Sequence, residues 1–110
     1  MATTYKILGQ SAPASTANAD LYTVPASTST VVSSITVTNT TTSVATAQIY
    51  IRKAAAAAAV GNALIYNLAI TPNSVNTYTL GLTLATTDVI TVQTATANAL
   101  TFQAFGSEIA

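Results

Sequence analysis

The sequence predicts an all-β domain, either an antiparallel sandwich or a barrel, of about eight strands. About 22 of its residues are threonine, and many alternate with valine, isoleucine, leucine or tyrosine as in half-buried strands. The strand candidates begin roughly 8 to 14 residues apart, and no segment keeps the 3.6-residue period of a helix. The 110 residues are the length of one domain, so we expect a single β domain over residues 1–110.

The amino-terminal half contains four strand candidates. Two are short, at Tyr5–Leu8 and Leu21–Val24, and a cleaner one at 35–39 places its apolar residues on one face. In the fourth, 48–52, the two isoleucines point one way, while Tyr50 and Arg52 point the other. Ser11–Asp20 consists mostly of alanine, serine, threonine and asparagine and includes Pro13, which predicts a flexible link. A simple loop is favoured there, although residues 1–20 could form an arm that reaches a neighbouring subunit.

A run of six alanines, Ala54–Ala59, separates the two halves of the chain. It has strong helix propensity but is too short for a stable isolated helix, so we expect a short helical turn or a loop crossing between sheets. The uncharged stretch continues to Ile70. It is too short and too rich in alanine to predict a membrane-spanning helix. Met1–Lys6 does not show the basic region followed by an apolar region that is typical of an export signal.

The carboxyl-terminal half contains four further strand candidates. In 64–70, four apolar side chains fall in register, which places Tyr66 in the core. Tyr78–Leu84 is the clearest strand: its four apolar side chains, Tyr78 included, share one face, and two threonines and Gly81 share the other. The same alternation marks 88–92 and 100–104. Turn residues separate the candidates at 25–28, 39–43, 72–76, 85–88 and 96–98.

Charged residues are scarce. The formal net charge is zero and only 5% of residues are charged, so the basic excess needed to bind nucleic acid or an anionic membrane is missing. Arg52 and Lys53 are adjacent, but in a strand they point to opposite faces, which favours a solvated strand end over a basic patch. A surface without net charge promotes association, so we expect an oligomer or a location covered by other proteins.

The residues that carry most enzyme chemistry are also scarce. Histidine and cysteine are absent, and the three carboxylates, Asp20, Asp88 and Glu108, stand where turn or surface residues are expected. A glycosidase would need two of them to converge, with no third group left to orient them. We therefore expect no enzyme, no catalytic residues, no metal site, no cofactor and no small-molecule substrate. Tyr50 could make an exposed contact, but packing across strands is favoured.

Five segments, which span nearly the whole chain, form a pattern: 5–11, 21–26, 31–39, 84–92 and 102–109, with sequences YKILGQS, LYTVPA, VVSSITVTN, LATTDVITV and FQAFGSEI. Together they resemble a family of small structural proteins from tailed bacteriophage virions. The alanine run is not part of the pattern.

The resemblance implies a jelly-roll-like sandwich that works by protein contact. It implies a capsid decoration or cement protein, a homotrimer that is assembled in the cytoplasm of the host bacterium and braces the phage head. Its partners would be the major capsid protein and copies of itself, on the capsid surface of the virion. The expected contact elements are the arm from Met1 to Asp20 and the segment Gly106–Ala110.

Two alternatives stay open at this point. The first is a component of the tail or a fibre, including a module that binds a host receptor. The second is a threonine-rich surface or ice-binding protein. An ice-binding solenoid would need a fixed repeat through the chain, and the tripeptide Ile-Thr-Val at 35–37 and 90–92 recurs without one.

Overall fold

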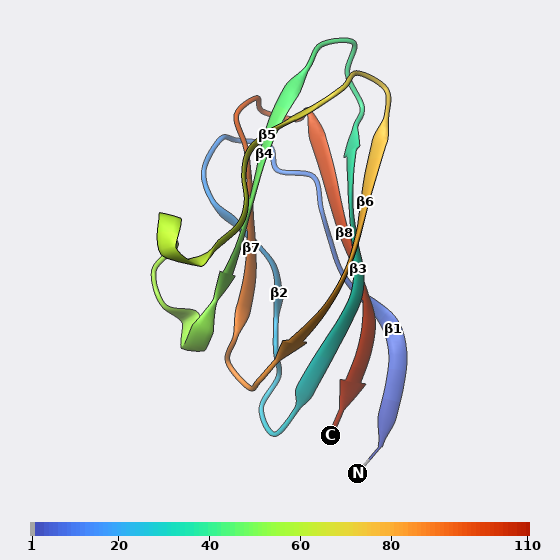
Figure 1. Cartoon of the computed structure of the whole chain (residues 1–110), viewed down its shortest axis with the longest axis vertical. Coiled ribbons are helices and arrows are strands. Elements are labelled where there is room, and N and C mark those ends of the chain that lie inside the picture. Colours follow the sequence, from blue (N-terminus) through green and yellow to red (C-terminus); the bar gives the residue numbers. More distant parts are fainter. Residues whose placement is uncertain (1) are drawn as a thin grey trace.

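The computed structural model describes residues 2–110, which form eight β-strands and two short 3-10 helices (Figure 1). The prediction of about eight strands is confirmed. In chain order the elements are β1 (Thr3–Ser11), β2 (Ala19–Thr23), β3 (Ser29–Asn39), β4 (Ala45–Arg52), η1 (Lys53–Ala55), η2 (Val60–Asn62), β5 (Ala63–Ile70), β6 (Val75–Leu84), β7 (Val89–Thr94) and β8 (Leu100–Ile109).

The strands form two four-stranded antiparallel sheets that pack face to face. Sheet A has the order β1-β8-β3-β6, and sheet B has the order β2-β7-β4-β5. The pairs β1·β8, β2·β7, β3·β6 and β4·β5 are nested like the two arms of one long hairpin. The pairs β3·β8 and β4·β7 then join neighbouring turns of this rolled hairpin. The fold is therefore an antiparallel β-sandwich with the strand order of a jelly roll.

The core lies between the two sheets and follows the alternation of the strands. Phe102 is its largest fully buried side chain, and Ile35, Ile49 and Ile90 from three other strands are also completely buried. Burying side chains of this size stabilises the fold by roughly 1.5 to 3 kcal/mol each. Because these residues come from both sheets, they hold the two layers together.

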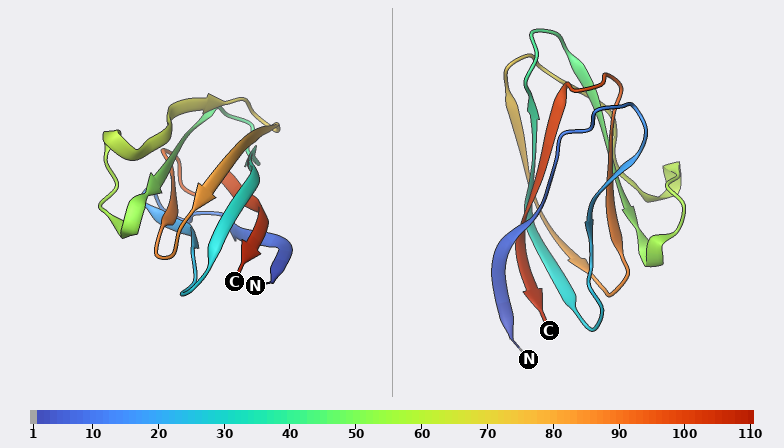
Figure 2. Two further views of the ribbon diagram at one scale, coloured as in Figure 1. Left: turned by 60° about the horizontal axis from the view of Figure 1, so that its bottom comes forward. Right: turned by 180° about the vertical axis from the view of Figure 1, so that it is seen from behind.

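Sheet A bends where three of its strands each contain an extra residue. The register shifts between Ile7 and Gly9 of β1, opposite Phe105 and Ala104 of β8. It also shifts between Val32 and Ser34 of β3, opposite Gly106 and Phe105 of β8. A further shift in β6, opposite the same point of β3, contains Gly81 at φ 60°. Bulges bend a strand and increase its twist, and Figure 2 shows the strands of this sheet curving along their length.

Three predicted core positions lie at the surface beside bulges: Tyr66, Leu80 and Leu68, the last of which is 37% exposed. Tyr66 is 52% exposed, because an extra residue in β5 beside Asn67 at φ 52° breaks the alternation expected over 64–70. Leu80 is 40% exposed next to the bulge in β6. Tyr78, before that bulge, packs against the core as predicted. The inward face therefore changes partway along each of these edge strands.

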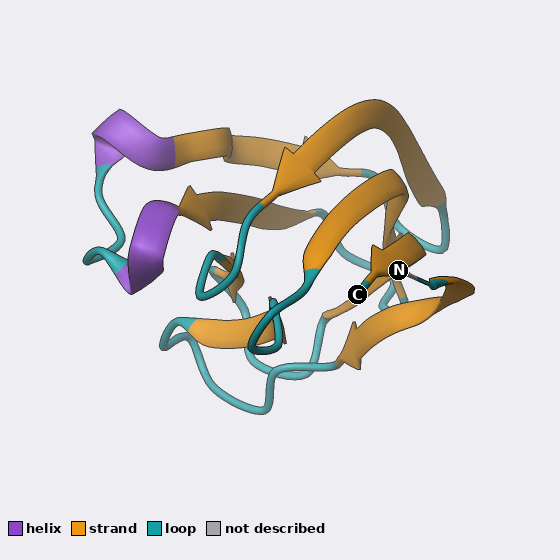
Figure 3. Cartoon of the chain, turned by 90° about the horizontal axis from the view of Figure 1, so that it is seen from below, coloured by secondary structure: helices purple, strands orange, loops and turns teal. Residues whose placement is uncertain are grey.

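The amino-terminal residues pack on the sandwich instead of forming a free arm. Residues 3–11 pair with β8, and the loop after them is held by hydrogen bonds from Asn98 N–H to the Pro13 carbonyl (3.0 Å) and from Gln93 Nε2 to the Thr16 carbonyl (2.9 Å). Ala2 and Ala110 exchange two backbone hydrogen bonds of 2.8 and 2.9 Å, so the two ends of the described chain, residues 2–110, lie side by side (Figure 3). The segment Gly106–Ala110, the other expected contact element, also pairs within the domain, because β8 is bonded to β1 and β3 up to Ile109.

The alanine run connects β4 and β5 within sheet B, so it does not cross between sheets. The expected helical turn is present as η1, with Ala54 and Ala55 at φ 52° and 59°. The segment folds back on the outer face of sheet B, where η2 contacts β4. Over residues 2–110, no helix has both the length and the apolar character to cross a membrane.

Candidate interaction surfaces

The three carboxylates that were candidate functional residues lie in three separate hydrogen-bond networks. Across residues 2–110 there is no pocket, and no group of three or more His, Cys, Asp or Glu side chains that could hold a metal ion. Asp20, Asp88 and Glu108 each bind groups of this chain. The three carboxylates therefore stabilise strands and turns of this chain.

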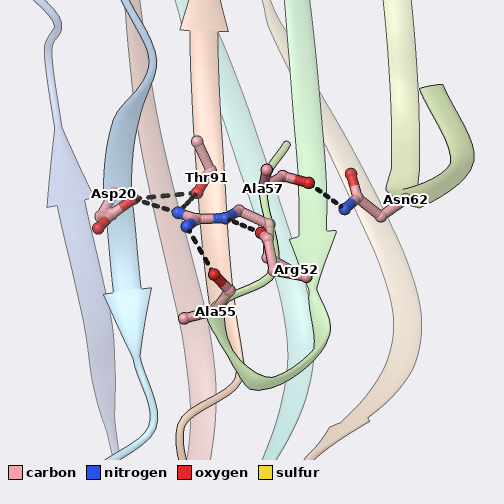
Figure 4. Close-up of polar contacts among 7 residues, drawn as sticks. Asp20, Arg52, Ala55, Ala57, Asn62 and Thr91 are labelled. Carbon is pink, nitrogen blue, oxygen red and sulfur yellow. Dashed lines mark hydrogen bonds and ion pairs between the residues drawn. The ribbon is translucent and has the colours of Figure 1, made fainter. Parts of the chain in front are cut away.

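Asp20 belongs to a network centred on Arg52 (Figure 4). Its Oδ1 accepts hydrogen bonds from Arg52 Nη1 at 3.1 Å and from Thr91 Oγ1 at 3.0 Å. The guanidinium also donates to the carbonyls of Ala55 (3.1 Å) and Ala56 (2.6 Å). Arg52 is therefore not the solvated strand end that the sequence suggested, because it fastens the alanine run to sheet B.

Asp88 holds the other side of the same loop. Its two carboxylate oxygens accept hydrogen bonds from the backbone N–H groups of Ala54 (2.8 Å) and Ala85 (2.9 Å). These two bonds lower the pKa of Asp88, since they stabilise the charged form. Asp88 thus ties the start of the alanine run to the β6–β7 turn.

Glu108 lies in a network that links the two sheets. Tyr22 of β2 donates to Glu108 Oε2 at 2.5 Å, and its hydroxyl lies 2.8 Å from Thr30 Oγ1. Lys6 Nζ of β1 lies 3.1 Å from Glu108 Oε1. The hydrogen bonds from Tyr22 and Lys6 lower the pKa of Glu108, whereas burial and the neighbouring carboxylate raise the pKa of Tyr22 to about 12. This network joins three strands of sheet A to β2 of sheet B.

Tyr50 is on the outer face of sheet B, as the alternation predicted, but it is only 7% exposed. It lies opposite Thr91 of β7, and its hydroxyl donates to Gln48 Oε1. Burial raises its pKa. Tyr50 therefore packs within the domain and presents no free contact surface.

Large exposed apolar side chains lie on both sides of the sandwich: four are on β5 and β6, and two, Tyr5 (84% exposed) and Ile7 (53% exposed), are on β1. Sheet A ends in β6 and sheet B ends in β5, and these two edges lie on the same side, since β1 contacts β2 and β3 contacts β5. We define the β5–β6 surface by its four large exposed apolar side chains: Tyr66, Leu68, Val75 and Leu80. Sequence reasoning missed this surface, because the bulges that turn Tyr66 and Leu80 outward are not visible in the hydrophobic pattern.

The β5–β6 surface carries no charge. The chain has no charged residue between Lys53 and Asp88, a stretch that contains the whole of β5 and β6. The opposite side of the sandwich differs, because its edge strands carry Lys6 in β1 and Asp20 in β2. The two sides therefore present different surfaces to a partner.

Comparisons with known proteins identify a structural neighbour. No family model and no curated protein sequence matches this chain. A chain in the solved structure of infectious bursal disease virus, Gx strain, aligns with it at a TM-score of 0.52 and 12% identity. The alignment covers 97% of this chain and 31% of the viral chain, so this chain spans about a third of that length. The whole sandwich is thus similar in fold to part of a viral protein.

Proposed function

We propose that this protein is a structural component of a virion, and specifically a decoration or cement protein on the head of a tailed bacteriophage. The observation that carries the proposal is the fold likeness to a viral chain across 97% of this chain. A fold by itself hosts many functions, so the surface supplies the second support. The strands β5 and β6 carry no charge and four large exposed apolar side chains, and the three carboxylates of the chain bind groups within the domain.

The proposed mechanism is bracing by repeated contacts. The domain is proposed to act as a rigid unit that transmits load between its neighbours. Three features hold it together: the hydrogen bonds between Ala2 and Ala110, the Glu108 network, and the hydrogen bonds from Arg52 to the alanine run. A standard interface takes about 800 Å² from each partner, which is about a seventh of the 5499 Å² surface of this chain. Each such contact can be modest, because many copies on one shell multiply its effect. The proposed partners are the major capsid protein and other copies of this chain.

Fractionation of the virion tests the location. Heads and tails of the phage that encodes this chain would be separated, with the major capsid protein and the tail tube protein as markers. The proposal expects the chain to follow the head marker through repeated purification. If tails free of heads retain it, the cement role is overturned and the tail or fibre component becomes the better description.

A further inference from the structure

The four edge strands of the sandwich differ in how they are protected against pairing with another chain. An unprotected edge offers a row of free backbone N–H and C=O groups, and proteins block such rows with charges, short strands or bulges. The edge strand β1 carries Lys6, and β2 has only five residues and carries Asp20. The edge strand β5 is broken in its middle by the bulge beside Asn67. Three of the four edges therefore contain blocking features.

The first five residues of β6, Val75–Thr79, contain none of these features. This segment, VNTYT, has no charge, no proline and no glycine, and over residues 2–110 β6 pairs only with β3. The bulge of β6 follows it, at Leu80 and Gly81. Val75 is 55% exposed, and Thr77 and Thr79 are exposed as well. Such a segment on a free edge is a template for strand pairing unless a partner covers it.

We propose that β6 pairs antiparallel with β6 of a second copy, so that sheet A continues across a twofold axis. A twofold contact brings each strand against its own sequence, and like charges placed opposite each other destabilise a strand pair. The charge-free stretch from Ala54 to Thr87 meets this requirement in every register, whereas β1 and β2 each bring a charged residue, Lys6 or Asp20, to such a pair.

This inference deepens the proposed function and rests on its self-association. It gives a dimer as the building unit, in place of the trimer implied by the sequence resemblance. The contact is isologous, because both copies use the same strand. It therefore closes at two chains and does not propagate into fibres.

The experiment measures the mass of the purified chain by light scattering coupled to size exclusion, at a concentration of about 100 μM. The expected mass is about 22 kDa, twice the 11.1 kDa of one chain. Thr79→Lys adds a charge to the free edge and should give the single-chain mass. Thr23→Lys, a matched exposed threonine on the edge strand β2, should keep the dimer.

Circular dichroism and thermal melting establish that each variant is folded, and Thr77→Lys replaces Thr79→Lys if the latter does not fold. A single-chain mass for the wild type, a three-chain mass, or a dimer that survives lysine at the edge would each overturn the pairing. These outcomes are separate from the proposed function, because a chain that is monomeric in solution but fractionates with phage heads overturns the pairing alone.

Discussion

The substitution Gly106→Ala tests whether close backbone packing at the bend of sheet A is needed for the fold. Gly106 lies in β8 beside the bulge of β3. A Cβ atom added there would stand 2.0 Å from the Val31 carbonyl oxygen and 3.0 Å from Val32 Cα. Both obstructing atoms belong to the backbone of an interior strand, so they cannot move aside as a flexible side chain could.

The expected cost follows from this overlap. Overpacking a well-packed interior costs roughly 1 to 3 kcal/mol, and a clash with backbone belongs at the upper end, about 3 kcal/mol. For a domain near this size, each kcal/mol lowers Tm by about 4 to 8 °C. We therefore expect Gly106→Ala to lower Tm by about 12 °C or more.

Thermal unfolding followed by circular dichroism measures the effect, and Gly61→Ala is the matched control. Gly61 lies in η2, with no atom within 4 Å of the place where a Cβ would stand. The control should change the free energy of unfolding by about 0.5 kcal/mol or less. If Gly106→Ala melts within a few degrees of the wild type, the close approach of β8 and β3 is not as described and the reasoning is refuted.

Three further substitutions test the polar networks. Glu108→Gln should lower stability by about 1 kcal/mol at neutral pH. The folded-state pKa of Glu108 is depressed, so its contribution is present above the ordinary value of 4.5 and fades as the pH falls through the folded-state pKa. Urea titrations of both proteins at pH 7 and pH 3 check this, and a constant difference would contradict it. Arg52→Met should release the alanine run, seen as faster amide exchange at Ala54 and Ala56 with β8 unchanged; equal exchange would show that the guanidinium does not hold the loop. Asn39→Ala should cost about 2 to 4 kcal/mol, because the buried side chain bonds the Ile70 and Ser43 carbonyls and Thr41. A urea midpoint within error of the wild type would disprove this assignment.

The sequence predicted which segments form strands, because apolar and polar residues alternate where one face of a strand is buried. It predicted the ends of strands less well. The candidate at 100–104 stops where Phe105 and Gly106 interrupt the pattern, yet β8 continues to Ile109 because β1 and β3 pair with it on both sides. Pairing with distant strands is therefore what extends the strand, and no local pattern reports it.

Register could not be predicted where a bulge intervenes. Gly81 within a strand pattern is a signal for a bulge, and it explains why Leu80 turns outward. Asn67 is a weaker signal of the same kind, and Tyr66 was placed in the core for lack of it. A single misplaced residue in an edge strand changes which side chains reach the surface, so the β5–β6 surface could not be predicted.

The polar networks could not be predicted because their members are far apart in the chain. Tyr22 and Glu108 are separated by 86 positions, and Arg52 and Asp20 by 32. The sequence placed the carboxylates as turn or surface residues, which holds for Asp88 at its turn and for Asp20, whose side chain is 57% exposed. The environment of Glu108 depends on the rolled topology, because this topology brings Tyr22 of β2 beside the end of β8.

The number of copies of this chain in each purified virion tests the central claim, a structural role on the phage head, most directly. Quantitative mass spectrometry of whole particles, scaled to the major capsid protein, gives that number. A decoration protein that braces the shell by repeated contacts is expected at hundreds of copies per particle. A dozen copies or fewer would contradict the account, because so few contacts cannot cover a shell.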